Sequence, residues 1–250
     1  MTTATTPTSA SAPTTDRPVP AAPRPATLTV PARFTGPVGM ANGGWLAGSL
    51  ARLLPSGPAM VTLRAPTPLD RALEVREGAT GVSLWDGDVL LAEAEAKGTV
   101  WMPPSGISFE QARRAEARFA GLEDHPFPGC FVCGTDRGED ALRIHPGPVV
   151  DRPGLIAATW TPSADLGAAD GLVDGRALWA ALDCPTGWAH FAPGGVAVLG
   201  RITGQVLQRP EPGEPCVVAA RRAVREGRKL WATSGVYRAD GSLAATAAAT

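Results

Sequence analysis

The chain has 250 residues, of which 44% are hydrophobic and 19% charged, and its formal net charge is −1. This length allows one large domain or two of ordinary size, and the near-zero charge gives no reason to expect nucleic acid or an anionic membrane as a partner. No apolar run approaches the ~20 residues of a membrane span, and the N-terminus lacks the basic and apolar segments of a signal peptide. We therefore expect a protein of a reducing, cytoplasmic setting, whose four cysteines form no disulfide framework.

The first half begins with a segment that cannot fold by itself. Residues 1–26 are rich in Thr, Pro, Ala and Ser, which predicts a disordered tail. An alternating pattern over residues 28–34 predicts a strand. Asn42 is a good N-cap and predicts a helix that ends at Leu54. Three strand-like runs follow, and the turn Asp86-Gly87 within the last of them is a strong hairpin signal.

The second half repeats this order after a polar helical linker at residues 109–119. Strands are predicted at 155–160 and 196–207, a helix begins after Asp174 between them, and Asp240-Gly241 marks a final hairpin. The shared plan predicts a duplicated α+β domain. A single irregular α+β domain without internal symmetry is the alternative. The expected boundaries are 27–104 for the first copy, 105–124 for the linker and 125–250 for the second copy.

The helix after Asp174 carries one carboxylate, Asp183, among Leu, Trp and Ala side chains. A lone buried acid costs free energy, so its presence needs a chemical reason. Asp183 follows Asp174 by nine residues, two and a half helical turns, and the ninth residue after Asn42 is Ala51. The two helices are thus predicted to be equivalent, but only one keeps an acid. Pro185 is expected to kink that helix or to end it.

Two short motifs carry a resemblance to a known family. Cys130-Phe131-Val132-Cys133-Gly134, followed by Leu142-Arg143-Ile144, resembles the opening of hot-dog-fold thioesterases of the phenylacetyl-CoA-thioesterase type. In that family the central helix begins at His-Gly-Gly, and the catalytic Asp follows at the spacing found here between Asp174 and Asp183. Neither helix start of this chain has the His, and Arg176 replaces the second glycine after Asp174. The resemblance implies a double hot dog of the α+β class, in which two antiparallel sheets are joined edge to edge and each is wrapped around a central helix.

The resemblance also implies a site between the two halves. Asp183 would face the amides of Gly43 and Gly44, which could polarise a thioester carbonyl and hold the oxyanion. Asp183 would act as a general base on water or as a nucleophile. The remaining predicted catalytic residues are Asn42 and Thr186, and the predicted substrate-binding residues are Trp45, Asp174, Gly175 and Trp179.

The implied function is hydrolysis of an acyl-CoA or acyl-carrier-protein thioester. No cofactor is implied, and a homodimer of double hot dogs is one assembly that the fold allows. One alternative is a non-catalytic protein that binds an acyl group or another small ligand. Another is a hydratase or dehydratase, which needs a His beside the acid, and His190 is the nearest candidate.

Other residues allow further interpretations. Cys130 and Cys133 with His125 and His145 could bind zinc, but one Cys-x-x-Cys pair is half a site, so no metal is predicted. Cys184 lies beside Asp183, and it lacks an obvious His partner for a nucleophilic role. Asp183 itself could be a purely structural acid. One group of arginines could contact the phosphates of CoA or form a solvated strand face: Arg221, Arg222, Arg225 and Arg228.

Overall fold

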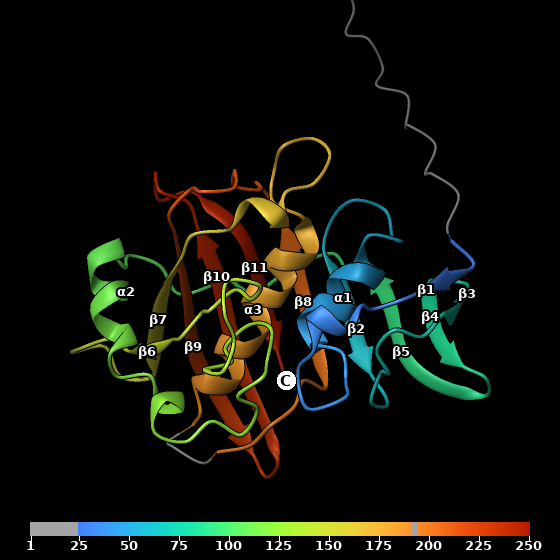
Figure 1. Ribbon diagram of the computed structural model, residues 1–250, viewed down its shortest axis with the longest axis horizontal. Helices are drawn as coiled ribbons and strands as arrows, with labels where there is room; N and C mark the ends of the chain where they lie inside the picture. The colour runs from blue at the N-terminus through green and yellow to red at the C-terminus, as the bar shows by residue number, and fades with distance from the viewer. Residues whose placement is uncertain (1–24, 192–194) are drawn as a thin grey trace, which may run out of the picture.

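The computed structural model describes residues 25–191 and 195–250, so most of the tail predicted for residues 1–26 lies outside the described residues (Figure 1). The described strands form one antiparallel sheet in the order β1-β3-β4-β5-β2-β8-β11-β10-β9-β7-β6. Their bounds are β1 Thr27–Leu28, β2 Ala59–Leu63, β3 Leu73–Glu77, β4 Gly81–Asp86, β5 Val89–Ala96, β6 Gly147–Pro148, β7 Leu155–Trp160, β8 Arg201–Val206, β9 Cys216–Glu226, β10 Lys229–Tyr237 and β11 Leu243–Ala249.

The sheet consists of two copies of one plan that meet where β2 pairs with β8. From this junction outward, β5, β4, β3 and β1 follow β2, and β11, β10, β9 and β7 follow β8. Val61 and Ile202 are register partners across the junction, and both are fully buried. The two predicted hairpins are present, with Gly87 and Gly241 at positive φ in their turns. The predicted repeat and its edge-to-edge junction are therefore confirmed.

Two helices lie against the same face of the sheet and pack against each other (Figure 1). These are α1, Gly43–Ala51, and α3, Gly175–Trp188. A Cβ at Gly44 would lie 2.5 Å from the Trp179 carbonyl oxygen, and a Cβ at Gly48, one turn later, would lie 2.9 Å from Arg176 Cα. The helices therefore run antiparallel with their backbones in contact, and only glycine fits at these two positions. This contact brings the start of α1 to the middle of α3.

Three local predictions were wrong. The strand expected at 28–34 is a two-residue strand followed by the 3-10 helix η1, Ala32–Phe34, because Pro31 has no N–H for the ladder and Phe34 instead stacks on Trp45. The helix expected to end at Leu54 ends at Ala51. The strand expected at 196–207 is shortened to β8. Pro185 does not end α3, which continues for three more residues at the cost of one backbone hydrogen bond.

The helix expected within the linker at residues 109–119 is present as α2, Phe109–Glu116, and it packs on β7. Ser108 begins it with a capping box, because its hydroxyl accepts from Gln111 N and the Gln111 side chain accepts from Ser108 N. Two further 3-10 turns are η2, Ala120–Leu122, and η3, Ala164–Leu166. No helix in residues 25–191 or 195–250 combines the length and apolar character that a membrane crossing requires.

Candidate active site

A cavity of about 690 Å³ opens between the two halves of the molecule. Asn42 and Gly43 at the start of α1 line it on one side, and Asp183 and Thr186 of α3 line it on the other. Its volume lies within the range of about 300–1,000 Å³ that is typical of small-ligand sites. The cavity is therefore large enough for a small ligand, and residues of both repeats line it.

Asp183 is held by the opposite helix. Its Oδ2 accepts a hydrogen bond of 2.7 Å from the backbone N–H of Gly44, and the residue is only 8% exposed. Of the two amides that were expected to face Asp183, the Gly44 N–H therefore contacts its carboxylate. Burial raises the pKa of the Asp183 carboxyl to about 7, the Gly44 N–H opposes that rise, and the nearby Cys130 adds to it. A carboxyl with a pKa near neutrality is suited to proton transfer.

The first three backbone amides of α1 differ in their hydrogen bonds. The Trp45 N–H donates to Oδ1 of Asn42, at 2.9 Å, and the Gly44 N–H donates to Asp183. Among the described residues, no acceptor is assigned to the Gly43 N–H, and Gly43 lines the cavity. The helix start therefore presents one unoccupied donor, together with the positive end of its dipole, beside the carboxylate.

Asn42 and Thr186 have structural contacts as well as positions on the cavity wall. Asn42 caps α1, and its Nδ2 lies 3.9 Å from the Cys130 sulfur and 3.8 Å from the Cys184 sulfur. The Thr186 hydroxyl donates to the backbone oxygen of Asp183 at 2.7 Å, so it does not hold the Asp183 carboxylate. The catalytic roles predicted for these two residues stay predictions.

The four predicted substrate-binding residues do not line the cavity. Trp45 stacks on Phe34 with ring centroids 3.5 Å apart, and Trp179 packs against Gly204 in the sheet. Asp174 caps α3 by accepting from the Arg176 N–H, and Gly175 is the first residue of that helix. These side chains therefore pack the helices and cap α3, and their positions do not support the predicted contact with substrate.

The described histidines are engaged in backbone contacts. His125 Nε2 bonds the Cys133 carbonyl oxygen at 2.9 Å, and its Nδ1 accepts from Phe127 N. His190 Nε2 bonds the Trp231 carbonyl oxygen at 2.8 Å. A hydratase would need a histidine in contact with the acid. No histidine among the described residues contacts the Asp183 carboxylate.

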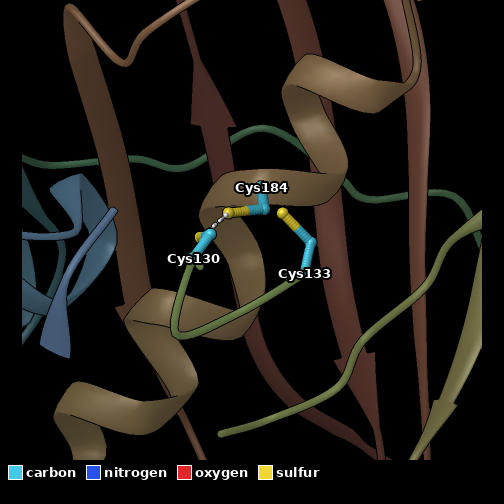
Figure 2. Close-up of side chains that lie close together, drawn as sticks. All are labelled: Cys130, Cys133 and Cys184. Carbon is cyan, nitrogen blue, oxygen red and sulfur yellow. Dashed lines mark hydrogen bonds between the residues drawn. The ribbon is translucent and has the colours of Figure 1, made fainter. Parts of the chain in front are cut away.

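Three cysteines meet at the cavity, and the sequence did not predict that they would lie together. Cys130 and Cys133 lie in a loop that crosses over α3, and their thiols approach Cys184 (Figure 2). Hydrogen bonds from the Cys133 thiol and then from the Cys184 thiol hold the pKa of Cys130 well below its usual range. The sequence offered a hint of this cluster. Cys184 directly follows Asp183, and Cys130 and Cys133 belong to the motif that carries the family resemblance.

Comparison with solved structures tests the fold. No protein-family model and no curated protein matches the chain. A protein of unknown function with a hot dog fold from Alicyclobacillus acidocaldarius is 12% identical and superposes with a TM-score of 0.55, over 89% of this chain and 90% of the other. This chain is a double hot dog.

Two other solved structures are similar to this double hot dog over most of its length. A candidate thioesterase II from Thermobifida fusca YX is 17% identical and has a TM-score of 0.56, over 90% of this chain and 96% of that one. The tesB protein of Mycobacterium avium subspecies paratuberculosis is 16% identical and has a TM-score of 0.54, over 88% of both chains. At these identities the likeness concerns the fold alone.

The two central helices of the double hot dog are not equivalent at the acid. In α3 the ninth residue after the cap is Asp183, whereas in α1 it is Ala51, the last residue of the helix. Correspondingly, Gly175 at the start of α3 has no carboxylate opposite it from α1. Within residues 25–191 and 195–250, the pairing of a helix-start amide with a carboxylate of the opposite central helix therefore occurs once, at Gly44 and Asp183.

Proposed function

We propose that the protein hydrolyses a thioester in the cavity between its two halves, with Asp183 as the general base. The observation that carries this proposal is the pairing of a buried carboxylate from α3 with the open helix start of α1. The two groups come from different repeats and meet at a cavity wall. Burial of an acid without a cationic partner is costly for a purely structural residue, and it is useful for a proton acceptor.

The two oxygens of Asp183 have separate tasks in this mechanism. Gly44 fixes Oδ2, whereas no partner is assigned to Oδ1 among the described residues. Oδ1 takes a proton from water as the water oxygen attacks the thioester carbonyl. The Gly43 N–H and the helix dipole stabilise the negative charge that develops on the carbonyl oxygen. The carbon–sulfur bond then breaks, and the proton on Asp183 passes to the departing thiolate, so a thioester and water give an acid and a thiol.

The cavity rim suits a thiol carrier that bears phosphates. Arg201, Arg228 and Lys229 line it, and among the described residues no carboxylate forms an ion pair with Arg228 or Lys229. Guanidinium and ammonium groups are the usual partners of phosphate in proteins. Trp188 and Phe191 add apolar wall for an acyl chain. An acyl-CoA or an acyl-phosphopantetheine is the substrate class that fits both features.

Reversing one rim charge should weaken binding of substrate without slowing the chemical step. For Arg228→Glu we expect KM for an acyl-CoA to rise about tenfold with kcat nearly unchanged, because the lost contact is made equally in the ground and transition states. Arg225→Glu is the matched control, since Arg225 is an exposed residue of the neighbouring strand β9 and does not line the cavity. An equal rise in KM with an acyl-pantetheine that has no phosphates would contradict the assignment.

The proposed function is tested by release of free thiol from a panel of acyl-CoAs that differ in chain length and in aromatic content. Turnover by the wild-type protein that disappears in Asp183→Asn supports it. Binding of acyl-CoA with no turnover by any member of the panel would replace it with the non-catalytic alternative. Loss of enoyl absorbance without thiol release would identify a hydratase instead.

A further inference from the structure

Three thiols converge at one end of the cavity and have no task in the proposed hydrolysis. Cys130 and Cys133 come from the loop before β6, and Cys184 comes from α3 (Figure 2). Their sulfur atoms all lie within 4.8 Å of one another, and the Cys130 and Cys184 sulfurs are 3.7 Å apart. All three residues line the cavity. The three sulfurs therefore surround one point at the wall of the cavity.

The loop that carries Cys130 and Cys133 aims donors at sulfur. The Val132 N–H donates to the Cys130 sulfur at 3.4 Å, and the Gly134 N–H donates to the Cys130 carbonyl oxygen at 2.9 Å. A Cβ at Gly134 would lie 2.4 Å from the Pro128 oxygen, so the turn requires glycine. From the other side, the Asn42 amide approaches two of the sulfurs. Donors directed at sulfur stabilise thiolates, the form in which cysteine binds metal.

The spacing of the sulfurs fits a metal better than a disulfide. With a Zn–S bond of about 2.3 Å, a tetrahedral site places its sulfurs about 3.8 Å apart. The Cys130–Cys184 distance of 3.7 Å agrees with that value. A disulfide needs sulfurs about 2.0 Å apart and would leave the third cysteine without a part. His125 could not complete the set, because both of its ring nitrogens are bonded elsewhere.

We propose that Cys130, Cys133 and Cys184 bind one thiophilic divalent cation of the Zn²⁺ class, with the fourth coordination position facing the cavity. Binding displaces the remaining thiol protons into solvent. The site anchors the loop that crosses α3 to the residue that follows Asp183. This proposal does not rest on the proposed hydrolysis, and it can be tested without any measurement of activity.

The test is titration of the reduced, metal-free full-length protein with Cd²⁺, followed by the ultraviolet charge-transfer absorption of cadmium–thiolate bonds. We expect saturation at one Cd²⁺ per chain. Cys130→Ser, Cys133→Ser and Cys184→Ser should each weaken Cd²⁺ binding on the order of 100-fold, since loss of even an outer partner of a metal ligand costs 10–100-fold. Cys216→Ser is the control, because the Cys216 thiol lies on β9 and donates to the Glu214 carbonyl oxygen.

Circular dichroism of each variant separates loss of the site from loss of the fold. A native spectrum with weakened Cd²⁺ binding in the three cluster variants supports the proposal. The proposal is overturned if the reduced wild-type protein develops no thiolate absorption. It is equally overturned if Cys216→Ser weakens binding as much as the cluster variants do.

Discussion

Asp183→Asn is expected to lower kcat for thioester hydrolysis by about 10²–10⁴-fold while the protein stays folded. The amide has nearly the shape of the carboxylate, and its oxygen can still accept from the Gly44 N–H, so the helix contact is kept. It cannot take a proton from water. Because burying an ionised carboxylate costs free energy, the melting temperature of the variant should be equal to or above that of the wild type.

The matched control for this variant is Asp174→Asn. Asp174 is the acid at the start of the same helix, and it lies outside the cavity. Asparagine is as good an N-cap as aspartate, so activity should change little. Loss of the partly exposed ion pair between Asp174 and Arg176 should cost at most about 1 kcal/mol of stability. The general-base assignment would be lost if Asp183→Asn kept wild-type kcat. It would also be lost if Asp174→Asn were equally inactive, because the effect would then follow from any loss of acid in α3.

Gly44→Ala is expected to lower both stability and activity. The added Cβ would lie 2.5 Å from the Trp179 oxygen, 2.6 Å from Asp183 Cβ and 2.8 Å from Ala180 Cα. None of these atoms is the end of a flexible side chain, so α1 must move away from α3. Overpacking of this kind costs about 1–3 kcal/mol. The shift also separates the Gly44 N–H from Asp183, and a displacement near 1 Å can cost about 100-fold in rate.

Thermal unfolding and thiol release measured on one preparation test this prediction. Gly175→Ala is the control, because it is a glycine at a helix start where an added Cβ meets no atom within 4 Å. Alanine favours the helix, so that variant should be as stable as the wild type or slightly more stable. The prediction is wrong if the Gly44→Ala protein has the melting temperature and the turnover rate of the wild type. The helices α1 and α3 could then move apart without loss of stability or activity.

Sequence patterns were sufficient for the features that depend on local rules. The Asn42 cap, the helix start after Asp174, the Asp-Gly hairpins and the repeat follow from the chemistry of single residues and from their spacing. The meeting of Asp183 with Gly44 followed from the resemblance, because it joins residues that are far apart in the chain. These were the parts of the fold and site that the sequence could predict.

Two residues lie away from the cavity for physical reasons that spacing alone does not reveal. Trp45 was expected at the substrate and adjoins Gly43, but at 100° per residue two positions turn a side chain to the far side of the helix, and Trp45 does not line the cavity. Trp179 lies one turn before Asp183, and the close glycines of α1 and β8 draw its indole into the core instead. The loop that carries Cys130 and Cys133 follows no periodic pattern. The approach of the Cys184 thiol to the thiols of these two residues could therefore not be predicted from spacing alone.

The presence of Ala51 where α3 has Asp183 has a consequence for how such a protein can change. In a symmetric dimer of identical single domains, any substitution occurs in both copies and alters two sites at once. In this chain the two copies are encoded separately, and one supplies the helix start while the other supplies the acid. A mutation therefore reaches only one of the two partners, so selection can act on the amide donors and on the carboxylate independently.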